Sequence, residues 1–160
     1  MKATIIKAKP EDHEELTKIS ALSKRHWGYP EEYFTIWEED LMVAPEYIDK
    51  HEVYNLVIAG KIIGFCSVEQ KEGLSEITHL WIIPEYIGKG LGTKLLRFVL
   101  EKIVVKGQKV TLVAERKAEG FYHKHGFVTI DEIQGKIPHR KLPYMVNYNF
   151  PDEEIDEEDK

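Results

Sequence analysis

Apolar and polar residues alternate along several short segments of the chain, and between these segments apolar residues recur every three to four positions. Residues 53–70 alternate on both sides of a turn at Gly60-Lys61, which predicts a β-hairpin. Residues 90–107 place Leu96 and Val99 on one apolar face, which predicts a helix. We expect further strands at 3–8, 75–83, 109–115, 127–133 and 142–150, and further helices at 9–27, 30–43 and 117–126.

The expected elements follow the order β-α-α-β-β-β-α-β-α-β-β. This order predicts an α/β fold with a central mixed sheet and helices on both of its faces. The chain of 160 residues is long enough for one compact domain, which we expect over residues 1–150. Residues 151–160 carry seven acidic side chains and one lysine, so we expect a solvated, disordered tail there.

The net charge of −6 belongs to this tail. Removing its seven acids and one lysine from totals of 28 and 22 leaves 21 charges of each sign, so nothing favours a nucleic-acid partner. No apolar run approaches the ~20 residues that span a bilayer. The first residues also lack the apolar core of a signal peptide, so we expect a cytoplasmic protein with no membrane partner.

Cysteine and histidine give little indication of metal chemistry. Cys66 is the only cysteine and lies in the apolar run IIGFCSV, so we expect it to be buried. His123 and His125 flank Lys124, but the chain has no HExxH motif. We therefore expect no metal site.

Three glycines at alternate positions, Gly88, Gly90 and Gly92, separate the strand expected at 75–83 from the next helix. Glycine costs conformational entropy on folding, so the cluster indicates that bare backbone approaches a ligand, such as a phosphate at a helix start. The order of residues does not match a P-loop. The dinucleotide pattern G-x-G-x-x-G fails at Leu95, although Glu115 lies near the place of a ribose-binding acid.

A third pattern fits two segments in the right order. The stretch LWIIPEYIGKGLGTKLL resembles the GNAT superfamily of N-acetyltransferases, whose phosphate loop follows a central strand and reads [Q/R]-x-x-G-x-[G/A]. AEGFYHKHGF resembles the family element A-x-x-[F/L]-Y-x-x-x-G-F, and the resemblance extends over residues 4–150. Two positions depart from the pattern: Ile87 replaces the usual Gln or Arg, and Glu115 stands where an Asn that holds the pantetheine arm is common.

The resemblance implies a GNAT fold and an enzyme that uses acetyl-CoA as cosubstrate. The glycine loop would then bind the pyrophosphate through backbone N–H groups at a helix start. The positions at which the resemblance implies cofactor contacts are Leu80, Trp81, Ile82, Ile87, Gly88, Lys89, Gly90, Leu91, Gly92, Thr93, Glu115 and Tyr122.

The resemblance also implies catalytic roles. Tyr122 would protonate the CoA sulfur, and the backbone N–H of Leu80 would stabilise the thioester oxygen. Glu76 lies eleven residues before Ile87, the spacing of the glutamate base in the histone-acetylating branch. His79 is the rival base, and strand alternation puts it on the opposite face from Glu76 unless a bulge intervenes. Many members instead deprotonate the amine through water.

The acceptor would lie against the first two helices and the last connection. Aromatic residues there, with nearby acids, suit a cationic or aromatic amine. Arg140, between two prolines, is placed to pair with an acceptor carboxylate or to pin its own loop. HWGYP and IPHRKLP loosely resemble small bacterial-type acetyltransferases. The expected acceptor contacts are Trp27, Tyr29, Tyr33, Trp37 and Arg140.

Three functions stay open from the sequence. The first is direct transfer of an acetyl group from acetyl-CoA to a primary amine of a small molecule. The second is acetylation of a protein or peptide amine, either N-terminal or lysine. The third is an acyl-CoA-binding or regulatory module without catalysis. A homodimer is compatible with any of them.

Overall fold

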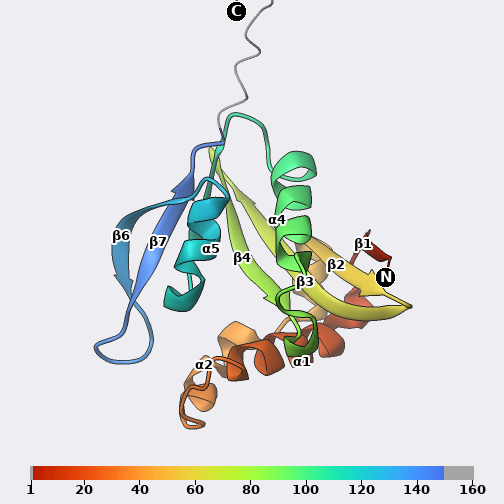
Figure 1. Cartoon of the computed structure of the whole chain (residues 1–160), viewed down its shortest axis with the longest axis horizontal. Coiled ribbons are helices and arrows are strands. Elements are labelled where there is room, and N and C mark those ends of the chain that lie inside the picture. Colours follow the sequence, from red (N-terminus) through yellow and green to blue (C-terminus); the bar gives the residue numbers. More distant parts are fainter. Residues whose placement is uncertain (1, 150–160) are drawn as a thin grey trace, which may run out of the picture.

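The computed structural model describes residues 2–149 and contains a seven-stranded mixed sheet with helices on both faces (Figure 1). The strand order is β1-β2-β3-β4-β5-β7-β6. This confirms the expected fold class. The strands are β1 (Ala3–Lys7), β2 (Glu52–Ile58), β3 (Lys61–Lys71), β4 (Leu74–Ile82), β5 (Lys109–Val113), β6 (Val128–Gln134) and β7 (Lys141–Asn147). The α-helices are α1 (His13–Arg25), α2 (Tyr33–Leu41), α3 (Pro45–Lys50), α4 (Leu91–Lys102) and α5 (Glu119–Lys124).

The expected element order agrees with the structure except for α3, which the sequence pattern did not predict. This helix has six residues and buries only Ile48, so it is too short to show helical periodicity. The hairpin turn lies one position earlier than the expected Gly60-Lys61, because Lys61 is already the first residue of β3 and pairs with Ile58. Ala59 and Gly60 form the turn, both with positive φ, as a two-residue hairpin requires. The acidic tail, residues 151–160, lies outside the described residues.

The two faces of the sheet are covered by different helices. Tyr54 of β2 packs edge-on against Phe98 of α4, and its strand partner is Cys66, so α4 covers the face that carries Cys66. Tyr47 of α3 donates a hydrogen bond to Glu69, which lies on the opposite face. Cys66 is fully buried, as expected. Within residues 2–149, no helix combines the length and the apolar character needed to cross a membrane.

Strands β4 and β5 form the one parallel pair in the sheet, and they pair over a short length. Leu74, Ser75 and Glu76 pair with residues 109–111, and beyond Glu76 the two strands separate. In Figure 1 the two parts of the sheet lie close together at one end and diverge toward α1 and α2, with α5 in front of the gap. The remaining two thirds of β4 therefore has a strand neighbour, β3, on one side only.

A β-bulge interrupts β4 beside this gap. Ile77 pairs with Val68 and His79 pairs with Ser67, so Thr78 is an extra residue on β4. The extra residue reverses the alternation of side chains beyond it. Glu76 and His79 consequently lie on the same face of the sheet, together with Ser67 and Glu69. The bulge thus brings the two candidate bases to one side.

Candidate active site

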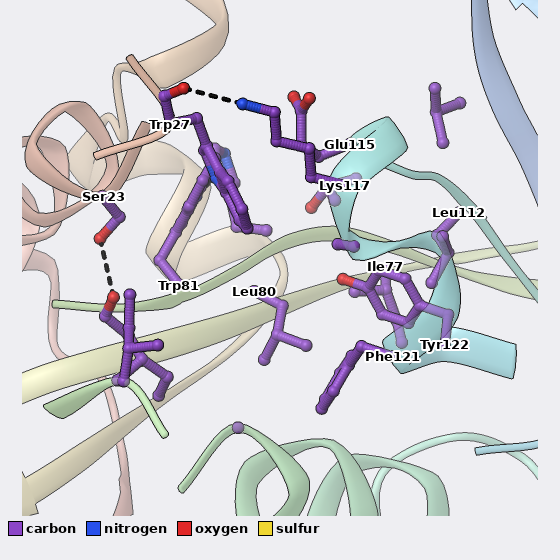
Figure 2. A pocket seen from close by; sticks show the side chains of 17 residues that line it. Ser23, Trp27, Ile77, Leu80, Trp81, Leu112, Glu115, Lys117, Phe121 and Tyr122 are labelled. Atoms are coloured by element: carbon purple, nitrogen blue, oxygen red, sulfur yellow. Dashed lines mark hydrogen bonds between the residues drawn. The ribbon is translucent and has the colours of Figure 1, made fainter. Parts of the chain in front are cut away.

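The gap between the two strands forms a cavity of about 350 Å³, which we call the β4–β5 cavity (Figure 2). Its walls are mostly apolar. Figure 2 shows Leu80 at its centre, Phe121 and Tyr122 on one side and Trp27 and Trp81 on the other. An apolar cavity of this volume suits a long, flexible ligand arm that carries few charges.

The glycine loop lies at the start of α4, beside the β4–β5 cavity. Gly88 and Gly90 both have positive φ, and a Cβ at either position would meet no atom within 4 Å. Gly90 is the N-cap of α4, and no side chain caps the helix. The first N–H groups of this helix therefore face open space and are available to an anion. Gly92 packs against Phe121 and lines the cavity, as does Ile87.

Tyr122 comes from α5 and points its hydroxyl group into the β4–β5 cavity (Figure 2). Its ring packs edge-on against Phe121 and Phe127, at 5.2 Å and 5.6 Å between ring centroids. Burial raises the pKa of Tyr122, because the charged form loses its hydration. The phenol therefore keeps its proton at neutral pH, as a proton donor must.

The backbone of Leu80 faces the gap. Ile83 donates its N–H to Ile63 on β3, and Trp81 pairs with Phe65. In an antiparallel pair alternate residues bond to the same neighbour, so Leu80 and Ile82 direct their N–H and C=O groups away from β3. The carbonyl of Ile82 accepts a hydrogen bond from Ser23, 3.2 Å away. The N–H of Leu80 thus points into the β4–β5 cavity, where β5 has separated from β4.

His79 is held as a neutral imidazole. The indole Nε1 of Trp81 donates a hydrogen bond of 2.9 Å to Nδ1 of His79. Since Nδ1 accepts that bond, the ring proton resides on Nε2. Burial lowers the pKa of His79 to about 4. At neutral pH this side chain offers a donor at Nε2 and no vacant basic nitrogen.

Glu76, the first candidate base, is partly exposed and ion-paired. Its side chain is 25% exposed and forms an ion pair with Lys71, with 2.7 Å between Nζ and Oε1. It lies one residue before the point at which β4 and β5 separate. Glu39, Asp40, Glu69 and Glu76 line an open groove on this face, which we call the acidic groove.

A second cavity of about 410 Å³, the basic cavity, lies between α1, α2 and the β6–β7 connection. Lys24 and Arg140 line it, and both pair with the buried carboxylate of Glu115, at 2.9 Å and 2.7 Å. The hydroxyl of Tyr29 also donates to Glu115. Burial lowers the pKa of Lys24, and the Glu115 charge opposes that shift. The carboxylate of Glu115 is therefore occupied by protein groups.

The three cavities meet at one place. Thr78, His79 and Val113 line the β4–β5 cavity, the basic cavity and the acidic groove alike. A ligand arm in the first cavity and a second molecule in either of the others would have their ends side by side at this junction. The arrangement is that of a two-substrate transfer site, with the β4 bulge at its centre.

Several expected site residues lie elsewhere than anticipated. Trp27 lines the β4–β5 cavity, and Lys117 donates to its carbonyl group. Tyr33 packs against Trp37 at 5.6 Å, beneath the basic cavity. Lys24 and Val113 were not anticipated, because a lysine on a surface helix and an apolar residue at a strand end carry no functional pattern. Residues 2–149 contain no group of three or more His, Cys, Asp or Glu side chains that could hold a metal.

The comparisons with known proteins agree with this geometry. A family model described as an acetyltransferase (GNAT) domain matches residues 49–129, half of the chain. An uncharacterised N-acetyltransferase of Archaeoglobus fulgidus is 32% identical over 69 residues, which cover 39% of this chain and 47% of that protein. The chain thus matches about half the length of this curated relative.

Solved structures share the fold over nearly the whole chain. PaiA N-acetyltransferase from Thermoplasma acidophilum, in complex with coenzyme A, is 23% identical with a TM-score of 0.72, over 92% of this chain and 99% of that one. The ribosomal-protein-S18-alanine N-acetyltransferase from Escherichia coli is 16% identical with a TM-score of 0.70, over 96% and 97%. At these identities the likeness establishes the fold alone.

Proposed function

Because the chain belongs to the GNAT family of N-acetyltransferases, we propose that it transfers the acetyl group of acetyl-CoA directly to a primary amine of a small molecule. The observation that carries the proposal is the junction at Thr78, His79 and Val113, where an apolar passage and two polar cavities meet. The amine nitrogen bonds to the acetyl carbon, the carbon–sulfur bond breaks, and the two products are the amide and CoA with its thiol protonated.

The chain offers a fitting site for acetyl-CoA, which supplies the acetyl group as a thioester. The first N–H groups of α4, with the open backbone at Gly88 and Gly90, are suited to the pyrophosphate. The apolar β4–β5 cavity is suited to the pantetheine arm. Glu115 takes no part in holding this arm in our proposal, because Lys24, Arg140 and Tyr29 already occupy its carboxylate.

The chain's own groups support three tasks at the junction. The N–H of Leu80 stabilises the negative charge that develops on the thioester oxygen. Tyr122 delivers its proton to the departing sulfur, since its phenol is protonated and faces the same cavity. Glu76, on the face of the acceptor, is a better base than His79, whose Nδ1 is bonded to Trp81.

Transfer is direct in this proposal. An acetyl-enzyme would need a nucleophilic side chain, and a thiol must ionise to serve as one. Cys66 has no exposed surface, and burial raises its pKa. The acetyl group therefore passes from the cosubstrate to the amine without a covalent intermediate on this cysteine.

The glycine loop gives the first test. Gly90→Val should weaken CoA binding by about tenfold or more, because a side chain blocks the approach of the pyrophosphate to the backbone. Gly73→Val is the matched control: Gly73 also has positive φ and open space around it, but lies in the β3–β4 turn. Both variants should lose similar stability, and only Gly90→Val should lose CoA affinity. Equal CoA affinity in the two folded variants, measured by calorimetry, would refute the assignment of the loop.

A thiol-release assay with acetyl-CoA and a panel of amines gives the second test. Release of CoA that depends on a small primary amine supports the proposal, with the acetylated amine identified by mass spectrometry. Turnover restricted to peptides with a free N-terminus or a lysine would replace the small-molecule acceptor by a protein. If the protein binds CoA but acetylates neither the small amines nor the peptides, the result would indicate an acyl-CoA-binding module without catalysis.

A further inference from the structure

The basic cavity contains more positive than negative charge. Lys24 and Arg140 both pair with the carboxylate of Glu115, and the charge of Asp40 also acts on Lys24. Lys136 also lines the cavity and pairs with Asp40, with 3.1 Å between the charged atoms. His79, the remaining titratable side chain of the lining, is neutral with its Nδ1 bonded to Trp81. One positive charge therefore has no counter-ion in this cavity.

Arg140 has hydrogen-bond donors to spare. All of its side-chain hydrogen bonds within residues 2–149 come from Nη2, which donates to the hydroxyl of Tyr29 and to both oxygens of Glu115. Nε and Nη1 have no hydrogen-bond partner among residues 2–149. A guanidinium with unused N–H groups in a cavity is suited to a carboxylate, which accepts several hydrogen bonds at once.

The loop that carries Arg140 is fixed in place. The side-chain amide of Gln134 donates to the carbonyl groups of Gly135, Ile137 and Arg140, at 3.1, 3.0 and 3.2 Å. Ile137 is 5% exposed and belongs to a small apolar cluster with Phe34, Trp37 and Leu41 of α2. Since the loop is anchored by both kinds of contact, a ligand of Arg140 does not have to order it.

Cations already cover the Trp37 ring of the cavity and the ring of Tyr29, which packs against Trp37. The Lys24 ammonium lies 4.3 Å from the centre of the Trp37 ring, and the Arg140 guanidinium lies 4.8 Å from that of Tyr29. At these two rings a positively charged group of an acceptor would meet cations instead of free ring faces. The acidic groove adjoins the junction from the other side. The charges across the junction therefore favour an acceptor whose anionic end enters the basic cavity and whose amine faces the groove.

We propose that the acceptor is an amino acid or a similarly small amine that carries a carboxylate, with the carboxylate bound by Lys24 and Arg140 and the amine at the junction. This inference rests on the proposed function and names the substrate class of the same site. It replaces the expectation of a cationic acceptor held by aromatic rings and acids. The geometry that supports it is the uncompensated positive charge in a cavity that opens onto Thr78, His79 and Val113.

The test measures binding by calorimetry, with and without saturating CoA, so it does not depend on turnover. The probes are the twenty amino acids, each compared with its carboxamide, which keeps the shape and removes the negative charge. At least one amino acid should bind the wild-type protein about tenfold or more tightly than its amide, the scale of a hydrogen-bonded ion pair. Lys24→Met and Arg140→Gln should each abolish the preference, while Lys102→Met should keep it because Lys102 is an exposed residue of α4 that lines none of the three cavities.

The outcomes of this experiment test the inference about the acceptor and the proposed function separately. If no amino acid binds, or if amides bind as tightly as amino acids, the inference is wrong. The inference is also wrong if a folded Lys24→Met or Arg140→Gln variant keeps the preference for an amino acid over its amide. CoA affinity is measured in the same series and tests the proposed function separately. If the protein does not bind CoA, the acetyl-CoA assignment is wrong. A preference for carboxylates would then still support the acceptor site in the basic cavity.

Discussion

His79 provides a prediction whose size follows from the structure. Burial lowers the pKa of this side chain to about 4, from an ordinary value of 6.5. A shift of about 2.5 pKa units corresponds to about 3 kcal/mol of differential stability. In the native state His79 stays neutral down to about pH 4, whereas the unfolded chain takes up the proton below pH 6.5. Between these values the unfolded state binds more protons, so stability falls as the pH is lowered.

The stabilising contribution of neutral His79 is therefore complete above pH 6.5 and is lost as the pH falls toward 4. By about pH 4.5 the wild-type protein should have lost about 2–3 kcal/mol of its free energy of unfolding through this one group. His79→Asn removes the titration and keeps an oxygen near the position of Nδ1 to accept the Trp81 indole. The variant should lack this part of the acid destabilisation.

Urea unfolding followed by circular dichroism at several pH values between 7 and 4.5 measures the effect. The difference between wild type and His79→Asn should narrow by about 2–3 kcal/mol over that interval. Leu22→Asn is the control, because Leu22 is exposed and carries no titrating group, and its curve should run parallel to that of the wild type. Parallel curves for wild type and His79→Asn would mean that the pKa of His79 is the same in the native and unfolded states, and the lowered pKa would be refuted.

Three further predictions concern catalysis and stability. Tyr122→Phe should keep CoA affinity by calorimetry and lower kcat by roughly 10²–10⁴-fold, since only the proton donor is removed; an unchanged kcat would exclude Tyr122 as the acid. Glu76→Gln should lower kcat/KM by roughly 10²–10⁴-fold, the scale of a positioned base, and His79→Asn should lower it far less; the reverse result would transfer the base role to His79. Glu115→Gln should cost about 2–3 kcal/mol in urea unfolding, because two partly buried cations lose their anion; a loss no larger than that of the exposed Glu101→Gln would show that the cluster is solvated.

The parts of the site that local patterns encode could be predicted from the sequence. The glycine loop was predicted because glycines at alternate positions before an amphipathic helix indicate that bare backbone approaches a ligand. The helix with Tyr122 followed from a short motif in the same way. Both features lie within stretches of about ten to twenty residues, and neither depends on how distant strands pair.

The junction depends on pairing between strands, which the sequence does not encode locally. Whether Glu76 and His79 share a face is decided by the extra residue Thr78, and the bulge is defined by the register of β4 against β3. The opening of the cavity likewise depends on where β4 and β5 cease to pair, beyond Glu76. Alternation alone put the two candidate bases on opposite faces, and the open alternative of a bulge is the one that the structure contains.

The departure of Glu115 from the family pattern and the presence of Arg140 belong to one feature. Lys24 and Glu115 are 91 residues apart and Glu115 and Arg140 are 25 apart, so no window of sequence contains the cluster. An asparagine at position 115 would leave two partly buried cations without this anion, at a cost of about 2–3 kcal/mol. With glutamate there, the cations are held together and one of their charges stays available to a ligand. The residue that was expected to hold the cosubstrate thus organises the cations that line the basic cavity.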